Sequence, residues 1–270
     1  PLLFGVYPDE TKAHKERMAL LFFEAFSVPG LYCANHGLLA LYGSGKTSGL
    51  VIDSGEDVTN LVPMQDGYMI EHAHGMIELG GSDVNEYLQN LLKNKKIIVD
   101  LEDARKIKES KLYIANEYSK ELESLKGSSG KHQSYELPDR TNFELAEELI
   151  QAGELLFRPG LVGKFEPGVH ELAAEALQKL EPELKRELFG NIILCGGNTL
   201  LQGYPNRLNR ELVTLSPNNI KVKLIAGPDR QNLSWSGGSV ISSLNTFQSM
   251  WITQADYEEH GPSIIHRKCL

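Results

Sequence analysis

The segment from Gly49 to Pro63 restricts the fold of this chain more than any other stretch. It reads Gly-Leu-Val-Ile-Asp-Ser-Gly-Glu-Asp-Val-Thr-Asn-Leu-Val-Pro. Two short apolar runs, Leu50–Ile52 and Val58–Val62, flank a polar turn sequence. Because β-branched residues favour strands and Asp, Ser and Gly favour turns, the segment predicts a β-hairpin.

The polar turn of this hairpin is a candidate phosphate loop. Gly55 can adopt a positive φ, which would let successive backbone N–H groups point at one anionic oxygen. Asp53, at the end of the first strand, could hold a cation or its water molecules beside that oxygen. An ordinary hairpin turn fits the same residues, so the turn alone leaves both interpretations open.

Composition narrows the class of protein. A chain of 270 residues is long for one hydrophobic core, which favours two lobes. The net charge of −9 argues against direct binding of nucleic acid, because phosphate backbones require basic surfaces. No apolar run approaches the roughly 18 residues of a membrane span. Cys33, Cys195 and Cys269 lie far apart, which favours a reducing intracellular compartment and neither a disulfide framework nor structural zinc.

Apolar periodicity predicts several further elements. They are a buried strand at Leu2–Pro8, helices at Lys12–Phe26, Tyr32–Tyr42, Leu101–Lys126 and Tyr204–Leu215, a strand at Ile220–Ala226, and a loop at Gly127–Lys131. Since a domain rarely begins on a core strand, the opening strand predicts that the chain is the C-terminal portion of something longer.

Two Gly-rich segments are candidates for binding. Gly196 and Gly197 follow an apolar strand and precede a helix, which makes a second possible anion site. Two such strand-to-turn units are what a nucleotide cleft requires. The segment Phe157–Val169 is rich in Gly and Pro yet carries apolar residues, so it either packs on its own lobe or contacts a partner.

Six motifs together closely resemble actin. They are Val51-Ile-Asp-Ser-Gly, Ser134-Tyr-Glu-Leu-Pro-Asp, Leu194-Cys-Gly-Gly-Asn-Thr, Ser234-Trp-Ser-Gly-Gly-Ser, Thr246-Phe-Gln-Ser-Met-Trp and Gly261-Pro-Ser-Ile-Ile-His-Arg-Lys-Cys. The resemblance runs from Pro1 to Leu270, with one short deletion near residues 97–101. It lacks roughly the first quarter of an actin, including the first phosphate loop. The sequence is therefore similar to the actin superfamily, as an actin or a divergent actin-related protein.

This resemblance implies an α/β protein with the actin-type ATPase fold, in which two ribonuclease-H-like lobes enclose a nucleotide cleft and the small lobe is incomplete here. Residues 1–43 and 233–270 would form the partial small lobe, which is subdomain 1-like. Residues 44–79 and 165–232 would form the base of the large lobe, which is subdomain 3-like. Residues 80–164 would form its outer, subdomain 4-like part.

The resemblance also implies a cofactor, ATP or ADP with Mg²⁺ or Ca²⁺. Asp53 would face the water shell of the metal and, with His36 and Asn60, would stand at the catalytic positions. The residues that the resemblance places against the cofactor are Ser54, Gly55, Glu56, Asp57, Val58, Gly81, Lys108, Glu109, Gly196, Gly197, Asn198, Leu200, Leu201 and Gln231.

Departures from the family pattern fall at these same positions. His36 replaces the glutamine that helps to position attacking water, and Asn60 replaces a histidine of the second phosphate loop. Both can still hydrogen-bond water, but positioning that water is most of phosphoryl-transfer catalysis. Asp57 stands where a glycine normally approaches phosphate, so its carboxylate repels phosphate unless a cation intervenes. Ser82, Gln231, Leu200 and Leu201 also differ from the family residues. The substitutions favour weak or lost ATPase activity over actin-like hydrolysis.

The resemblance implies surfaces for partners as well. Tyr42, Tyr68, Ile241, Leu244 and Met250 match the barbed-end groove, where actin-binding regulators insert a helix. The segment Phe157–Val169 matches the plug that reaches across filament strands, and Lys164 stands there in place of an apolar residue.

Two functions of different classes follow. The first is an actin-like cytoskeletal protein of the cytoplasm that binds ATP or ADP and assembles with other actin-family protomers. The second is a non-hydrolysing structural subunit of a cytoskeletal, ciliary or chromatin assembly, which allows a ciliary or nuclear location. A small-molecule kinase of the same fold is disfavoured by the C-terminal motifs.

Overall fold

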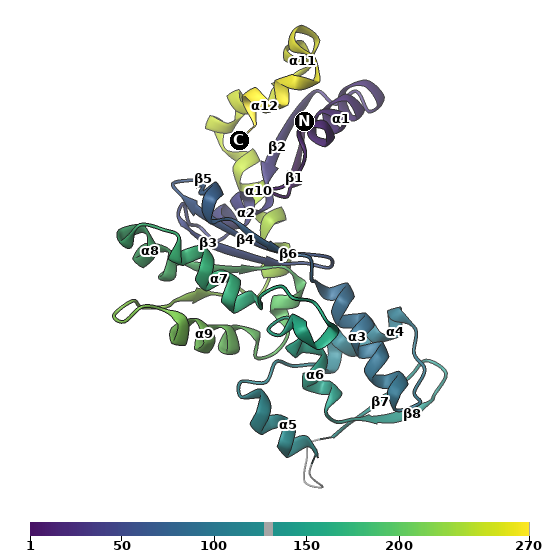
Figure 1. The fold of residues 1–270 in the computed structure, drawn as a ribbon. Coiled ribbons are helices and arrows are strands. Elements are labelled where there is room, and N and C mark those ends of the chain that lie inside the picture. Colours follow the sequence, from purple (N-terminus) through teal and green to yellow (C-terminus); the bar gives the residue numbers. More distant parts are fainter. Residues whose placement is uncertain (127–131, 270) are drawn as a thin grey trace.

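Three β-sheets organise the chain in the computed structural model, which describes residues 1–126 and 132–269 (Figure 1). The strands are β1 (Leu2–Val6), β2 (Gly30–Asn35), β3 (Gly49–Ser54), β4 (Thr59–Gln65), β5 (Tyr68–Met69), β6 (Gly75–Ile77), β7 (Gln133–Glu136), β8 (Asn142–Leu145), β9 (Ile192–Cys195), β10 (Leu224–Ile225) and β11 (Ile252–Thr253). The sheets have the orders β1-β2-β11, β10-β9-β3-β4-β5 with β6 on β4, and β7-β8.

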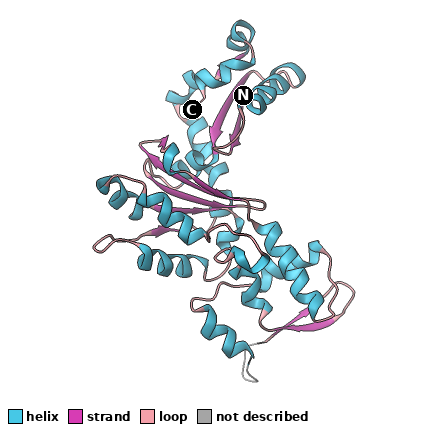
Figure 2. Ribbon diagram, in the orientation of Figure 1, coloured by secondary structure: helices cyan, strands magenta, loops and turns pink. Residues whose placement is uncertain are grey.

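Helices surround these sheets and fill the space between them (Figure 2). The α-helices are α1 (Lys12–Leu20), α2 (His36–Gly43), α3 (Gly81–Asn94), α4 (Leu101–Lys111), α5 (Tyr118–Lys126), α6 (Glu148–Glu154), α7 (Val169–Gln178), α8 (Pro182–Phe189), α9 (Tyr204–Leu215), α10 (Leu233–Ser243), α11 (Gln254–His260) and α12 (Ile265–Lys268). Short helical turns are η1 (Leu21–Ala25), η2 (Glu71–Ala73), η3 (Pro159–Val162), η4 (Gly197–Leu200), η5 (Arg230–Asn232), η6 (Asn245–Met250) and η7 (Pro262–Ile264). No helix of the described residues has the length and apolar character to cross a membrane.

The predicted hairpin forms the centre of the largest sheet. Strands β3 and β4 pair antiparallel, and β9 pairs parallel with the other edge of β3. The register sets Asp53 opposite Asn60 on one side and opposite Cys195 on the other. The mixture of parallel and antiparallel strands with helices confirms the α/β class. Asp53 consequently lies at the end of the central strand, between two turns.

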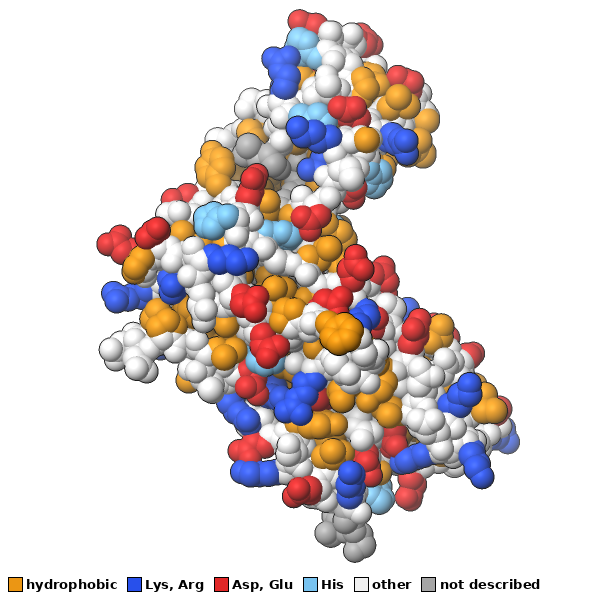
Figure 3. All heavy atoms as spheres, in the orientation of Figure 1, with side chains coloured by type: hydrophobic (Ala, Val, Ile, Leu, Met, Phe, Trp, Pro, Cys, Tyr) orange, Lys and Arg blue, Asp and Glu red, His pale blue; other side chains and the backbone are white. Residues whose placement is uncertain are grey.

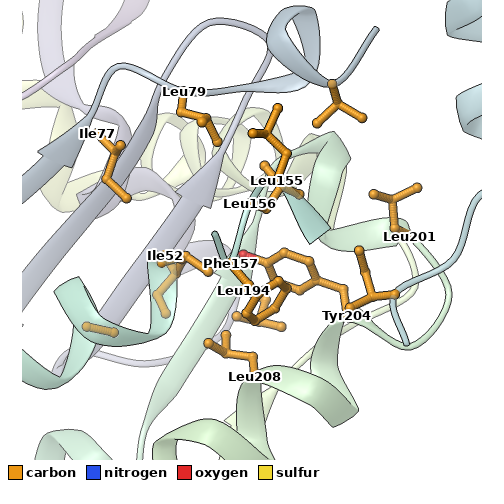
Figure 4. Packing of buried hydrophobic residues seen from close by; sticks show 14 of the residues in the cluster. Ile52, Ile77, Leu79, Leu155, Leu156, Phe157, Leu194, Leu201, Tyr204 and Leu208 are labelled. Atoms are coloured by element: carbon orange, nitrogen blue, oxygen red, sulfur yellow. The ribbon is translucent and has the colours of Figure 1, made fainter. Parts of the chain in front are cut away.

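The main hydrophobic core lies between this sheet and its covering helices. Apolar side chains of β3 and β9 meet those of α7 and α9, and the large rings of Phe157 and Tyr204 pack near its middle (Figure 4). The ring centroids of Phe157 and Tyr204 are 5.5 Å apart. Burial of such rings stabilises the sheet on which the candidate turns are built.

Both ends of the chain build a smaller, separate core (Figure 1). Strand β2 pairs with β1 on one side and with the short β11 on the other. One cluster unites residues from β1, α1 and β2 with residues from β11, α11 and α12, including Leu31, Ile252 and Ile265. This part of the fold therefore exists only when the first 35 and the last 20 or so residues meet.

Helices α2 and α10 connect this smaller part to the large sheet. Gly237 of α10 lies against α2 so closely that a Cβ atom there would be 1.7 Å from the carbonyl oxygen of Leu39. Gly43 likewise faces the Leu233 carbonyl oxygen, at 2.5 Å from its own hypothetical Cβ. Small residues thus allow the two helix backbones to approach each other.

Three predicted elements were wrong in detail. Residues 32–42 are not one helix, because Leu31–Ala34 form the buried centre of a sheet and only His36–Gly43 are helical. The helix predicted at 101–126 is interrupted at Leu112, where the chain becomes extended so that Ile114 can enter the core. Of the strand predicted at 220–226, only Leu224–Ile225 pair with β9. The loop predicted at Gly127–Lys131 lies outside the described residues.

Candidate functional site

The turn between β3 and β4 is closed by its own backbone. The Gly55 amide donates a hydrogen bond to the Val58 carbonyl oxygen at 3.0 Å. Gly55 does not adopt the predicted positive φ, because this bond closes the turn with ordinary backbone angles. Ser54 is fully buried, and its hydroxyl lies 2.9 Å from that of Thr59. The Ser54 side chain therefore supports the turn from behind and is not presented to the cleft.

A second turn, after β9, is locked onto the first. The side-chain amide of Asn198 donates to the Gly55 carbonyl oxygen at 2.6 Å and to the Ser54 hydroxyl at 3.1 Å. Gly196 has φ 88°, and a Cβ there would lie 2.2 Å from the Ser54 carbonyl oxygen. Only glycine allows this approach. The two Gly-rich turns identified in the sequence thus form one unit.

The beginning of α3 completes this unit. The Gly81 amide donates to the Gly55 carbonyl oxygen at 3.0 Å, and the Ser82 amide donates to that of Glu56 at 2.8 Å. The Asp83 carboxylate caps the helix by accepting from the Gly80 amide at 2.8 Å. The hairpin turn is therefore held at both its Gly55 and its Glu56 carbonyl groups.

Lys108 brings a buried cation to the same place. Its ammonium group donates to the Gly81 carbonyl oxygen at 3.0 Å and lies 3.9 Å from the Glu56 carboxylate. Burial lowers the pKa of Lys108, because it disfavours the charged form, while Glu56 opposes that effect. A Cβ on Gly81 would lie 2.8 Å from this ammonium group, so the lysine fits only beside a glycine.

A cleft of about 770 Å³ opens beside these groups. Its lining consists of Gly55, Glu56, Arg105, Lys108, Glu109, Ser110, Lys111, Leu112, Tyr113, Gln133, Gly197, Asn198, Leu200, Leu201, Gln202 and Gln231. The lining thus holds three cationic side chains and two carboxylates. Two of these charged groups already form an ion pair with each other, because Arg105 Nε lies 2.9 Å from Glu109 Oε1. The lining therefore favours an anionic ligand.

The predicted catalytic residues His36 and Asn60 lie near Asp53, but none of the three lines this cleft. His36 lines another cavity, of about 560 Å³, between β1 and α10. Burial raises the pKa of Asp53, and the nearby His36 partly offsets this. Asn60 is almost fully buried, and neither polar atom of its side chain has a hydrogen-bond partner in the described structure. An unpaired buried amide is costly, so this position is suited to a water molecule or a ligand atom.

Tyr7 belongs to the same group and was missed by the sequence analysis. Its ring stacks on His36, with 5.0 Å between ring centroids, and its hydroxyl reaches toward Gly55. Burial raises the pKa of Tyr7, and the carboxylates of Asp53 and Asp57 raise it further. In the sequence, Tyr7 is an aromatic residue directly after a core strand, and that position alone does not indicate a functional site.

Most of the predicted cofactor-binding residues are brought together. Nine of them line the cleft: Gly55, Glu56, Lys108, Glu109, Gly197, Asn198, Leu200, Leu201 and Gln231. Gly196 directly precedes this lining, at the start of η4, and is not part of it. Gly81 lies behind Lys108. Val58 and Asp57 lie on the turn outside the cleft lining, and Ser54 lies behind it.

The five predicted groove residues surround one apolar hollow of about 430 Å³. Tyr42, Tyr68, Ile241, Leu244 and Met250 all line it, and Phe247 and Val240 extend its wall. Tyr68 and Leu244 are exposed. The hollow lies where α2, α10 and the turn between β4 and β5 meet.

The loop around η3 projects a single aromatic ring. Phe165 is fully exposed, whereas Phe157 and Val169 at the two ends of the segment are buried. Lys164 contacts the Glu78 carbonyl oxygen and lies 2.8 Å from the Asp83 carboxylate. The segment is thus anchored at its ends and at Lys164, and Phe165 faces solvent.

The sheets, the two locked turns and the cleft beside them define the class of this protein as an α/β protein with an actin-type fold. Figure 3 shows that its surface is hollowed where the smaller part joins the larger one, and that acidic and basic side chains are interspersed on this face. Comparison with protein families gives the same answer. The model of the family described as Actin matches residues 1–102 and 99–270. The chain belongs to the actin family.

Proposed function

We propose that this chain binds ATP or ADP, with Mg²⁺ or Ca²⁺, in the cleft beside the two locked turns. The observation that carries this proposal is the junction of the hairpin turn, the Gly196–Asn198 turn and Lys108 at a cleft lined by more cations than carboxylates. Bound ATP would supply a phosphoanhydride bond, and its phosphates would supply the charge that this lining offsets.

The residues present fit such a ligand, with one condition. Lys108 offers the cleft a buried charge that is suited to an anionic ligand, and the unpaired Asn60 amide lies opposite Asp53 in the sheet, outside the cleft lining. Glu56 and Asp57, however, place carboxylates on the turn that would approach phosphate. Among the described residues, no group of three or more His, Cys, Asp or Glu side chains could hold a metal alone. The cation would therefore be held by Asp53 through water and by the phosphates, and binding should require it.

Nucleotide binding can be tested by calorimetric titration of the full chain with ATP, with and without Mg²⁺. Lys108→Met should weaken binding by about 10- to 100-fold, because a charge-assisted hydrogen bond contributes roughly 1.5–3 kcal/mol. Lys106→Met is the matched control, since Lys106 is on the same helix but pairs with Asp103 outside the cleft lining. No binding by the unaltered chain, or equal losses in both variants, would contradict the proposal.

We further propose that hydrolysis is weak or absent, as in a structural subunit. His36 lines a different cavity and is stacked under Tyr7, and the Asn60 side chain is buried. Neither lines the cleft, and neither carries the side chain with which the family positions attacking water. In a single-turnover assay of phosphate release, the double variant His36→Gln, Asn60→His should hydrolyse ATP at least tenfold faster than the unaltered chain. Rapid release by the unaltered chain would overturn this part.

Assembly through actin-type contacts is the last part of the proposal. The apolar hollow at Tyr68 and Leu244 is suited to the apolar face of a helix from an actin-binding regulator or to another actin-family protomer. Leu244→Asp should abolish such binding, whereas Val213→Asp, an equally exposed position on α9, should not. Sedimentation velocity with and without actin would distinguish these outcomes. The cytoplasmic, cytoskeletal location remains a prediction.

A further inference from the structure

Two of the three cysteines meet although they lie at opposite ends of the chain. Cys33 is in the middle of β2, and Cys269 directly follows α12, 236 positions later. Strand β11 pairs with Gly30 and Leu31, so β2 extends beyond it. In the space that β11 leaves, the Cys33 amide donates to the Cys269 sulfur at 3.2 Å.

This contact brings the two residues within the reach of a disulfide bond. An amide nitrogen is about 1.5 Å from its own Cα atom. The Cys269 sulfur consequently lies no more than about 4.7 Å from the Cys33 Cα, as the 3.2 Å contact requires. Bonded cysteines have Cα atoms roughly 4.4–6.8 Å apart. The Cys269 Cα lies one side chain farther away than its sulfur, so joining the sulfurs requires rotation of the two side chains and a shift of the chain end.

The two thiols differ in accessibility. Cys33 is buried in the cluster that joins β1, β2 and α12, whereas Cys269 is partly exposed. Cys269 packs against that cluster and also against the cluster of Tyr32, Phe247 and Trp251. A reagent can therefore reach Cys269 first, and Cys33 is placed to react with it second. This is the order of attack that a resolving cysteine requires.

We propose that Cys33 and Cys269 form a reversible intramolecular disulfide that fastens the C-terminal helix to β2. With glutathione disulfide as oxidant, the Cys269 thiolate attacks one of its sulfurs, and one glutathione leaves as thiolate. The Cys33 thiolate then attacks the Cys269 sulfur, and the second glutathione leaves. The two cysteine protons end on the two glutathiones, so one disulfide is reduced for each one formed.

The environment makes this reaction slow at neutral pH. Burial raises the pKa of Cys269 to about 11 and that of Cys33 to about 12. The nearby Cys269 adds to the effect at Cys33, whereas the hydrogen bond from the Cys33 amide opposes it at Cys269. The thiolate is the nucleophile, so its fraction at Cys269 grows about tenfold per pH unit well below the pKa. The pair would respond to sustained oxidation more than to brief exposure.

The bond would act on the partner hollow as well as on the chain end. Tyr32 and Phe247, against which Cys269 packs, line the hollow proposed for partners. Oxidation would fix one wall of this hollow by holding the segment after α12. This consequence depends on the proposed assembly function, whereas formation of the disulfide does not.

Mass spectrometry of the full chain in glutathione buffers of stepped ratio tests the bond itself. The expected result is a loss of about 2 Da, reversed by dithiothreitol, and a tryptic product that joins Cys269–Leu270 to Met18–Lys46. The rate of formation should rise about tenfold between pH 7.5 and pH 8.5. Hydrogen exchange at Ile264–Lys268 should slow in the oxidised protein.

Variants separate this bond from other oxidation. Cys33→Ala and Cys269→Ala should each abolish the 2 Da loss, whereas Cys195→Ala should retain it, because Cys195 lies in the large sheet near Ser234. Cys269 ends the helix, so its variant folds even if Cys33→Ala does not. Glutathione bound to Cys269 without the cross-linked peptide, linkage between two chains only, or a 2 Da loss that persists in Cys269→Ala would overturn the proposal.

Discussion

Arg207 shows how much the fold depends on one buried charge. Its guanidinium group donates to both carboxylate oxygens of Glu154, at 2.9 and 3.0 Å, and to the Ala115 carbonyl oxygen at 2.9 Å. It also lies 5.0 Å from the centre of the Phe157 ring. Burial raises the pKa of Glu154, and Arg207 opposes that effect. This pair ties the segment after α4 and helix α6 to helix α9.

Removing one partner of this pair should destabilise the protein strongly. We expect Arg207→Met to lower the free energy of unfolding by about 3 kcal/mol, because the buried Glu154 carboxylate would lose its buried partner and keep only the exposed Arg158, at 3.1 Å. The double variant Arg207→Met, Glu154→Leu should recover part of that loss. Urea unfolding followed by circular dichroism measures both, and a loss below about 1 kcal/mol in the single variant would show that the pair is solvated.

At the scale of elements, the contact of α2 with α10 joins the two parts of the molecule. Gly237→Ala would place a Cβ 1.7 Å from the Leu39 carbonyl oxygen. The clash is with backbone, so relieving it requires the two helices to move apart. We expect a loss of roughly 2–4 kcal/mol, comparable with severe overpacking of a core. Gly227→Ala is the control, since its added Cβ has no atom within 4 Å among the described residues other than its chain neighbours. Thermal melting of the two variants tests this, and equal melting temperatures would contradict it.

The η3 loop offers a second prediction at this scale. Lys164 and Asp83 form an ion pair that is partly exposed, so its contribution to stability should be no more than about 1 kcal/mol. Its effect on the loop should be larger, because Lys164 also contacts the Glu78 carbonyl group.

Hydrogen exchange of the backbone amides measures how often this loop opens. We expect Lys164→Met to accelerate exchange at 160–166 by about tenfold, as one local contact of about 1.4 kcal/mol would imply. A double-mutant cycle with Asp83→Asn should give a coupling of at least about 0.5 kcal/mol. Exchange that stays unchanged in Lys164→Met would mean that the ends of the segment hold the loop without this pair.

For the whole molecule, two partly buried histidines contribute to the response to acid. His74 and His170 each have a ring nitrogen, Nε2 and Nδ1 respectively, that lacks a hydrogen-bond partner among the described residues. Burial lowers the pKa of both below the usual 6.5, although Asp9 opposes this at His74 and Glu171 opposes it at His170. The unfolded chain therefore binds protons at a higher pH than the folded chain does.

The sign of the pH effect follows from this difference. Stability should fall as the pH drops below about 6.5, with each histidine contributing up to about 1.4 kcal/mol per pH unit. The double variant His74→Asn, His170→Asn should flatten the dependence of unfolding free energy on pH between 6.5 and 5. Denaturant titrations at several pH values measure this slope, and an equal slope in the variant would assign the dependence to other groups.

Much of the fold could be predicted from local sequence. The hairpin at 49–63, helix α9 and the Gly196 turn follow from patterns within about fifteen residues, because β-branched runs, amphipathic spacing and Gly turns act locally. The two interrupted elements could not be predicted in this way. Residues 32–35 and 112–117 have compositions that suit a helix, but pairing and burial with distant segments decided their backbone.

The sequence by itself determined the family, the hairpin turn and the residue types at the cleft, because these depend on residue types and their spacing along the chain. Only the tertiary structure decided which of those residues meet. It placed Ser54 behind the turn, His36 in a separate cavity under Tyr7, and Lys108 beside Gly81. It also joined Cys33 to Cys269. Contacts between positions tens or hundreds of residues apart depend on how sheets and helices pack, and packing is a property of the whole core.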